Sequence, residues 1–211
     1  MDRGPVDELP PSGATLHELA EAARHCQRCP LFANATQTVF GEGPRNASVI
    51  LIGEQPGDKE DLEGRPFIGP AGRMLDRGLV EAGIDRERLY LTNAVKHFKN
   101  EPRGKKRLHK TPDVREVKIC SAWLKREIEA LNPKLVVAMG ATAARALTGK
   151  AVPIGASRGH VLFLNGNRRA IITVHPSFLL RVSDDTARAL EFRRFVSDLR
   201  LILREAPQVA L

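Results

Sequence analysis

Three cysteines and one histidine have the residue types and spacing of a metal centre. Cys26 and Cys29 form a Cys-x2-Cys pair, which lets two thiolates bind one centre from a tight turn. Cys120 and His97 are the natural third and fourth ligands. Three cysteines plus one histidine suit zinc or an iron–sulfur cluster, and the ligand count does not decide between them. Two further interpretations are a redox pair at Cys-x2-Cys, and a structural role in which Cys120 is a buried hydrophobic residue and His97 lies at the surface.

A basic segment over residues 99–112, KNEPRGKKRLHKTP, is the second chemical feature. It carries six cations, one carboxylate and a single imidazole at His109. No helix or strand period fits it, so we predict a loop. Its charge predicts contact with a polyanion, in which His109 is incidental on charge alone. The cations expected to make that contact are Lys105, Lys106, Arg107 and Lys110.

An α/β fold must position these residues. Apolar runs predict core strands over 48–53, 89–92, 134–139 and 170–174. Helices are expected over 16–25, 71–82, 141–147 and 185–203, and from Thr111 or Asp113 to 131, with Thr15 and Glu18 forming a capping box on the first. A hairpin is expected over 159–167. This alternation predicts a three-layer sandwich with a central, mainly parallel four-stranded sheet flanked by helices.

Polar residues follow the four predicted strands. Ligands of such folds bind outside the carboxyl ends of the strands. The residues there are Glu54-Gln55-Pro56-Gly57-Asp58, Asn93, Gly140-Ala141-Thr142 and His175-Pro176-Ser177. Three of these four ends carry groups suited to chemistry, which indicates an enzyme.

Composition limits the class of protein. At 211 residues we expect one domain over 14–211, preceded by a loose tail over 1–13. The net charge of +8 points to a nucleic-acid partner before a membrane. No stretch resembles a membrane span or a signal peptide, and three cysteines argue against a disulfide framework. We therefore expect a cytoplasmic monomer that does not bind membranes.

Taken together, GEQPGDKED (53–61), Asn93, HPS (175–177) and the cysteines resemble the uracil-DNA glycosylase superfamily, specifically its iron–sulfur branch. The resemblance covers about residues 16–203, and its motifs are specific as a set. Ordinary members of this branch have Ala in place of Gln55 and Cys in place of His97, and they lack the inserted KKRLHK. These three differences are similar to UdgX, the branch known for bonding covalently to uracil-containing DNA. The resemblance implies a structural four-iron, four-sulfur cluster on Cys26, Cys29, His97 and Cys120.

Uracil excision defines what the remaining residues should do. Breaking the bond between N1 and the sugar C1′ passes through an oxocarbenium-like state, and the base leaves as an anion with charge on O2 and O4. The resemblance implies that His175 donates to O2, that Asn93 reads the N3–H and O4 edge and rejects cytosine, and that Phe67 stacks on the base. The alternatives are a buried His175 satisfied by backbone, an Asn93 that caps a turn, and a Phe67 that anchors a loop.

The loop after the first strand completes the expected pocket. Gly53 and Gln55 would line it, with Gln55 a hydrogen-bond donor. Asp58 would orient a water or hold the loop.

Glu54 and His109 carry the expected mechanism. A neutral imidazole of His109 is the better nucleophile at C1′, and Glu54 can accept its second proton. The product is a neutral N-alkyl imidazole whose leaving group is a strong base, so its hydrolysis should be extremely slow and the enzyme single-turnover. The alternatives are a multiple-turnover glycosylase in which His109 only contacts DNA, and a non-catalytic metal-dependent nucleic-acid-binding module.

The remaining basic and hydroxyl groups are expected at phosphates. Ser177 joins the cations of the basic segment there, with Arg158 and Arg181 as lesser candidates. An already unstacked base is easier to capture, so we expect single-stranded DNA as a substrate.

Overall fold

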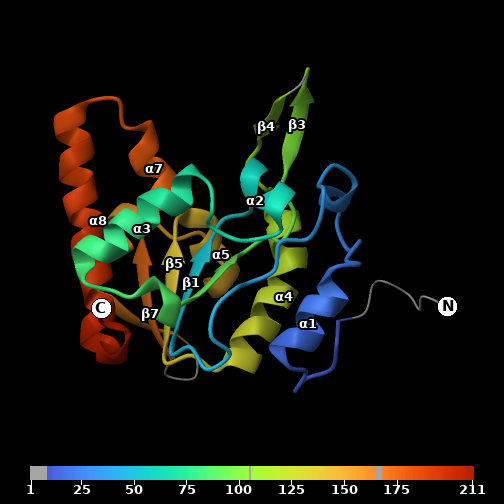
Figure 1. The fold of residues 1–211 in the computed structure, drawn as a ribbon, viewed down its shortest axis with the longest axis horizontal. Coiled ribbons are helices and arrows are strands. Elements are labelled where there is room, and N and C mark those ends of the chain that lie inside the picture. The colour runs from blue at the N-terminus through green and yellow to red at the C-terminus, as the bar shows by residue number, and fades with distance from the viewer. Residues whose placement is uncertain (1–8, 105, 165–167) are drawn as a thin grey trace.

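The computed structural model describes residues 9–104, 106–164 and 168–211. At its centre lies a five-stranded sheet with the strand order β2-β1-β5-β7-β6 (Figure 1). The strands are β1 (Val49–Gly53), β2 (Tyr90–Asn93), β5 (Leu135–Met139), β6 (Val161–Leu164) and β7 (Arg168–Thr173). β2, β1, β5 and β7 are mutually parallel, and β6 pairs antiparallel with β7. The predicted α/β fold with a mainly parallel sheet is therefore confirmed.

The fifth strand corrects the prediction of four. The expected hairpin over 159–167 is instead one edge strand, β6, which pairs with the next core strand, with Val161 opposite Ile171. Its apolar residues VLFL were not counted as a sheet strand because an edge strand is only half covered, and Phe163 remains 67% exposed. Residues 165–167 of that segment lie outside the described residues.

Helices cover both faces of the sheet, which confirms the three-layer sandwich. One layer contains α3 (Pro70–Ala82), α7 (Pro176–Arg181) and α8 (Asp185–Glu205). The other contains α4 (Val114–Leu131) and α5 (Ala141–Thr148), with α1 (Leu16–Ala23) packed on α4. The short helices are α2 (Asp58–Glu63) and α6 (Ile154–Ser157), with 3-10 turns at Pro30–Ala33, Arg86–Arg88 and Pro207–Val209. Within the described residues, no helix is both long and apolar enough to cross a membrane.

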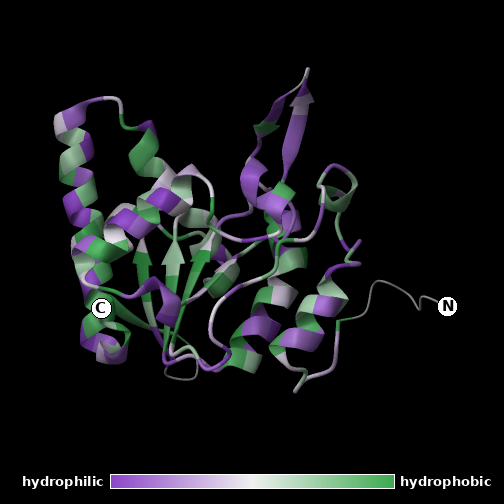
Figure 2. Cartoon of the chain, viewed as in Figure 1, coloured by the Kyte–Doolittle hydropathy of each residue, from purple (hydrophilic) through white to green (hydrophobic). Residues whose placement is uncertain are grey.

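The strands are apolar throughout because each of the central ones is buried on both faces. Val49 and Leu51 of β1 pack into the core beneath α3 and α8, whereas Ile50 and Ile52 pack into the core beneath α4 and α5. Figure 2 shows β1, β5 and β7 as hydrophobic in the middle of the molecule. Successive strand residues face opposite layers, so a continuous apolar run is what this sheet requires.

Capping residues fix where α1 and α4, the two helices next to the candidate metal ligands, begin. Thr15 and Glu18 form the predicted capping box on α1. Of the two caps considered for α4, Asp113 is the one used, in a capping box with Glu116. Residues 1–8 of the expected tail lie outside the described residues, and Leu9 packs against the core between α1 and α4.

The basic segment forms a β-hairpin, so the predicted loop is wrong. β3 (Asn100–Arg103) pairs antiparallel with β4 (Lys106–His109), with Asn100 opposite His109. Gly104 has a φ of +59°, a left-handed conformation that glycine adopts without strain and that reverses the chain here. Periodicity missed the hairpin because most of its residues are hydrophilic (Figure 2). Figure 1 shows the hairpin projecting from the body of the molecule.

The segment after β2 is buried, although NAVKHFK reads as polar. Lys96 and Glu127 form an ion pair in which both side chains are fully buried. Thr92 and Tyr90 donate hydrogen bonds to the same carboxylate, at 2.9 and 3.1 Å. Lys96 Nζ also donates to the Asn93 carbonyl at 2.8 Å. This network joins β2, which ends at Asn93, to the middle of α4.

Candidate active site and metal centre

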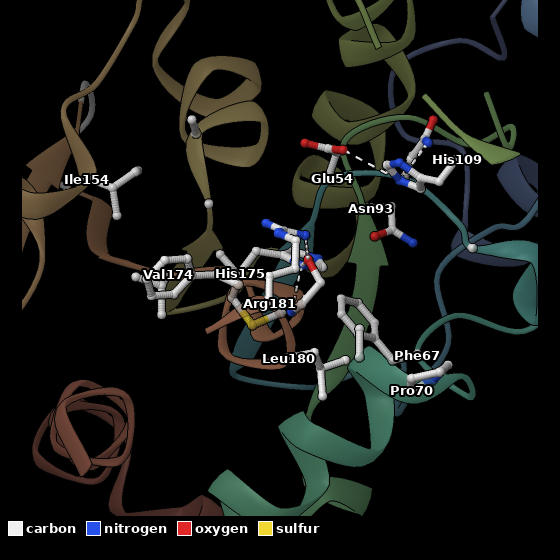
Figure 3. Close-up of a pocket in the computed structure, with 18 of the residues that line it drawn as sticks. Glu54, Phe67, Pro70, Asn93, His109, Ile154, Val174, His175, Leu180 and Arg181 are labelled. Carbon is white, nitrogen blue, oxygen red and sulfur yellow. Dashed lines mark hydrogen bonds and ion pairs between the residues drawn. The ribbon is translucent and has the colours of Figure 1, made fainter. Parts of the chain in front are cut away.

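A cleft of about 1570 Å³ lies at the carboxyl ends of the parallel strands (Figure 3). Each of these strands delivers at least one residue to its lining as the chain leaves the sheet. Among them are Glu54 after β1, Asn93 at the end of β2, Gly140 after β5 and His175 after β7. The structure thus brings together the polar side chains of Glu54, Asn93 and His175, which are far apart in the sequence.

Gly53 marks the point on which three predicted base contacts converge. A Cβ atom built on Gly53 would lie 2.4 Å from Asn93 Oδ1, 2.6 Å from Phe67 Cζ and 3.3 Å from His175 Nε2. The Phe67 and His175 rings have centroids 6.3 Å apart and planes inclined by 31°. Because Gly53 has no side chain, an amide, the edge of an aromatic ring and an imidazole can pack closely around this backbone position, and these are groups that can recognise a nucleobase.

His175 presents an N–H to this space. The Ser177 backbone N–H donates to His175 Nδ1 at 3.2 Å, so Nδ1 is an acceptor. Burial, with a smaller contribution from Arg181 and His109, lowers the pKa of His175 to about 4. A neutral ring whose Nδ1 accepts must carry its hydrogen on Nε2, the atom that faces Gly53.

Ser177 lies behind His175. Its hydroxyl is 2.8 Å from His175 Nδ1 and accepts a hydrogen bond from Arg181 at 3.0 Å. In this arrangement Ser177 orients His175, and its expected phosphate contact stays a prediction. Arg181 lines the cleft beside them (Figure 3).

Gln55 fixes the state of His109. The Lys99 backbone N–H donates to Gln55 Oε1 at 3.0 Å, and Gln55 Nε2 donates to the Lys110 carbonyl at 3.0 Å. These contacts set the orientation of the amide, so Gln55 Nε2 must also be the donor in its 2.9 Å contact with His109 Nε2. His109 Nε2 therefore holds the lone pair, and its Nδ1 carries the hydrogen. Burial is the main reason that the pKa of His109 is lowered, which favours this neutral form.

Glu54 lies on the same side of the imidazole as Gln55. Glu54 Oε1 is 3.7 Å from His109 Nε2 (Figure 3). Thr142 donates a 2.6 Å hydrogen bond to Glu54 Oε2. In this arrangement the hydrogen of a neutral His109 is on Nδ1, away from Glu54, and the expected role of Glu54 as acceptor of the second imidazole proton stays a prediction. The carboxylate places negative charge beside the nitrogen that holds the lone pair.

Arg107 is held against the protein by ion pairs, and its side chain is 23% exposed. Its guanidinium donates to Asp58 at 2.7 Å, pairs with the fully buried Asp61, and lies 5.4 Å from the centroid of the Phe98 ring. Two carboxylates neutralise this cation, which makes it a tether between β4 and α2. Of the two roles expected for Asp58, this contact fits holding the loop.

The other cations of the hairpin differ in their surroundings. Lys106 is exposed, and Lys110 pairs with Glu101. Lys105 lies outside the described residues. Arg158 pairs with Glu191 and Asp198, at 2.9 and 2.8 Å, so its charge is already balanced. Lys106 and the exposed Arg103 opposite it in β3 are thus the described hairpin cations placed to meet a phosphate.

His97 is buried, and its hydrogen bonding leaves one ring nitrogen able to bind a metal. Thr38 donates its hydroxyl hydrogen to the Ala23 carbonyl at 2.7 Å, so toward His97 Nε2, 3.0 Å away, the same oxygen can only accept. His97 Nε2 therefore carries the hydrogen and Nδ1 keeps its lone pair. Burial lowers the pKa of His97 to about 4, which keeps the ring neutral. The interpretation of His97 as a surface residue is wrong.

The three cysteines lie in one buried core cluster between α1 and α4. The Trp123 indole N–H donates to Cys26 Sγ at 3.2 Å, and the Lys96 backbone N–H donates to Cys120 Sγ at 3.2 Å. Burial raises the pKa of Cys29, and it raises that of Cys120 to about 12. N–H donors aimed at sulfur are the means by which proteins stabilise and tune thiolate ligands.

The donor set suits a zinc ion as well as an iron–sulfur cluster. Among the described residues, no group of three or more Cys, His, Asp or Glu side chains that could hold a metal ion is found. A zinc ion would need four ligand atoms, each within about 2.3 Å of the metal. In an iron–sulfur cluster each ligand binds a different iron atom, so three thiols and one imidazole around a shared buried region suit it.

Sequence reasoning missed several residues of the site. Thr142 was noted only as one of the residues that follow the third predicted strand, and Glu60, Asp61 and Lys96 were not singled out. Nothing in the sequence indicated that these three charged residues are buried, because each is of a type usually found at a solvated surface. The sequence could have indicated the start of α2, because Asp58, Glu60 and Asp61 concentrate acidic residues in its first turn, where the helix dipole favours them.

Comparison with known proteins agrees with this geometry. The family model of the uracil DNA glycosylase superfamily matches residues 40–200. A type-4 uracil-DNA glycosylase of Thermotoga maritima is 40% identical over 179 residues, which cover 84% of this chain and 87% of that protein. A type-4 uracil-DNA glycosylase of Pyrobaculum aerophilum is 33% identical over 173 residues, covering 79% and 85%. A type-5 uracil-DNA glycosylase of the same organism is 29% identical over 154 residues, covering 58% and 65%. The matched region contains β1, β2, β5 and β7, whose ends form the cleft, and we conclude that the chain belongs to the uracil-DNA glycosylase superfamily.

Proposed function

We propose that this protein excises uracil from DNA and then bonds covalently, through His109, to C1′ of the abasic deoxyribose, as the UdgX branch does. The observation that carries the proposal is the lone pair of His109 Nε2, held beside Glu54 in the cleft that also contains Asn93, Phe67 and His175.

Excision uses the groups that converge near Gly53. The N1–C1′ bond breaks, and its electron pair leaves with the uracil, whose negative charge spreads to O2 and O4. His175 Nε2–H donates to O2 as that charge develops, and a neutral donor does so without releasing its own proton. Asn93 pairs with N3–H and O4, and Phe67 stacks on the base. Glu54 stabilises the positive charge that develops on the sugar.

Covalent capture uses the hairpin. His109 Nε2 leaves the Gln55 amide, whose N–H groups still have the Lys99 and Lys110 carbonyls as acceptors. Its lone pair forms the bond to C1′, and the Nδ1 proton is lost to water, because the His109 side chain is half exposed. The resulting neutral alkyl imidazole is a poor leaving group, so each molecule of protein reacts once.

The metal centre is proposed to be a four-iron, four-sulfur cluster on Cys26, Cys29, His97 Nδ1 and Cys120. When bound, it would join three parts of the chain. These are the turn after α1, which carries Cys26 and Cys29, the segment after β2, which carries His97, and α4, which carries Cys120. A brown colour and broad visible absorption in freshly purified protein are expected, whereas a colourless protein that contains zinc would contradict the cluster.

Denaturing electrophoresis tests the central proposal. We expect a slow-migrating, denaturant-resistant band after incubation with a uracil-containing oligonucleotide, and none with the thymine-containing counterpart. His109→Ser should remove the band and release free uracil. His160→Ser is the matched control, because His160 is exposed, lies outside the cleft lining and should leave the band unchanged.

The outcomes separate the alternatives. Free uracil in molar excess over the protein, with no band, would support a multiple-turnover glycosylase in which His109 only contacts DNA. No band and no uracil from any oligonucleotide would support a non-catalytic binding module. Single-stranded and duplex oligonucleotides are compared in the same gel, and we expect the single strand to react.

A further inference from the structure

Phe67 has a strained backbone. Its φ is +57°, in the left-handed region that L-residues with bulky side chains avoid. In the described part of the chain, the other non-glycine residue with a positive φ is Asn132, which caps α4 and belongs to a type that tolerates this conformation. An aromatic residue persists in such a conformation only where its surroundings enforce it.

Two contacts enforce it at the Phe67 carbonyl. A Cβ atom on Gly72, in the first turn of α3, would lie 1.8 Å from Phe67 O, so the helix backbone packs directly behind this peptide. The Arg86 guanidinium donates to the same oxygen at 3.3 Å and is itself paired with Asp76. These contacts fix the peptide but leave the chain after Phe67 free to turn.

Glu60 fixes that following segment. The Gly69 backbone N–H donates to Glu60 Oε1 at 2.7 Å, and Glu60 is only 6% exposed. A Cβ atom on Gly57 would lie 2.7 Å from Glu60 Oε2, so the carboxylate is packed against the turn that follows Gln55 as well as the turn that follows Phe67. Burying a carboxylate is costly, and a short charge-assisted hydrogen bond with defined direction is what offsets that cost here.

We propose that Glu60 is a positioning residue that holds Phe67 in its strained conformation, so that the ring forms one wall of the base pocket. Glu60 does this through its hydrogen bond with Gly69, which fixes the chain just after Phe67. The inference rests on the proposed function, because only a bound base requires the Phe67 ring at this place.

A double-mutant cycle tests the role. Uracil release is measured for the wild type, Glu60→Met, Phe67→Leu and the combination of both. Glu60→Met keeps the side-chain length but removes the acceptor, and a displacement of the ring by about 1 Å should lower the single-turnover rate constant of uracil release roughly 100-fold. In the Phe67→Leu background the same change should have little further effect, because the ring it positions is gone. Glu60→Gln keeps an oxygen acceptor for Gly69 and should restore most of the lost activity.

Controls separate positioning from general destabilisation. Glu63→Ala, on the exposed side of the same helix, should match the wild type. If Glu60→Met does not fold, Arg86→Met replaces it in the cycle, because it removes a hydrogen bond to the Phe67 carbonyl from the other side. Additive losses in the cycle, or a Glu60→Gln variant as impaired as Glu60→Met, would overturn the positioning role alone. A wild type that releases no uracil would overturn the proposed function and this role with it.

Discussion

Replacing Gly53 with alanine presses one methyl group against the three side chains that are expected to contact the base. Gly53 is the last residue of β1, in an extended conformation that alanine adopts freely, so the backbone itself should accept the change. The new methyl group would lie 2.4 Å from Asn93 Oδ1 and 2.6 Å from Phe67 Cζ. Ordinary contacts begin at 3.4 Å, so Asn93 must move by about 1 Å and Phe67 by nearly as much.

The expected loss follows from that displacement. Misplacing a catalytic contact by about 1 Å costs on the order of 100-fold in rate, or about 2.7 kcal/mol of transition-state stabilisation. Over-packing by one methyl group costs about 1–3 kcal/mol of folding stability. For a chain of this size that lowers Tm by about 2–4 °C per kcal/mol, so the variant should remain folded at 25 °C.

Single-turnover uracil release from a labelled oligonucleotide measures the effect, with thermal unfolding measured in parallel. Gly155→Ala is the matched control, because Gly155 lines the same cleft but a Cβ atom there would meet nothing within 4 Å. It should release uracil like the wild type. Full activity of a folded Gly53→Ala variant would refute the assignment of Asn93, Phe67 and His175 to the base pocket.

Three further predictions concern the hairpin, the buried ion pair and pH. Arg107→Met should slow covalent capture at least 10-fold in time-course gels, because Arg107 tethers the hairpin that carries His109. Uracil release should fall less, because Arg107 does not hold the base pocket. A loss confined to salt-dependent DNA affinity would instead indicate that Arg107 contacts a phosphate. Glu127→Gln leaves the buried Lys96 without a counter-charge and should cost about 3–5 kcal/mol, a fall in Tm of roughly 10 °C, and an unchanged melting curve would contradict the pair's role. His175, with its pKa lowered to about 4, should stay neutral and active well below pH 6.5, so the acid limb of the rate profile should lie nearer pH 4. Between pH 6.5 and about 4 the unfolded chain binds a proton at His175 that the folded chain does not, so stability should fall as pH is lowered through this window, as denaturant titrations would measure.

The hairpin shows where sequence reasoning ended. Its charge and its histidine were recognisable, but its strands were not, because they carry no alternation of apolar and polar residues. What folds the segment is contact with distant residues: Gln55 binds His109 across 54 positions, and Arg107 pairs with Asp61 across 46. Pairs between residues so far apart in the same chain leave no local sequence pattern.

Charged residues were misread for a related reason. Lys96 and Glu60 look like surface residues in the sequence, since such side chains are seldom fully buried without a partner. Each becomes buried because tertiary structure supplies that partner, Glu127 for Lys96 and the Gly69 N–H for Glu60.

The sequence by itself determined the layers of the fold and the chemical groups of the site. Apolar runs identify buried strands, their alternation with helices specifies a parallel sheet, and the ends of such strands must meet at one edge. Tertiary structure alone decided which nitrogen of His175, His109 and His97 carries the hydrogen, and which cations remain free for DNA. The physical reason is that tautomer and charge balance depend on hydrogen-bond partners within about 3 Å, and the fold brings those partners from remote parts of the chain.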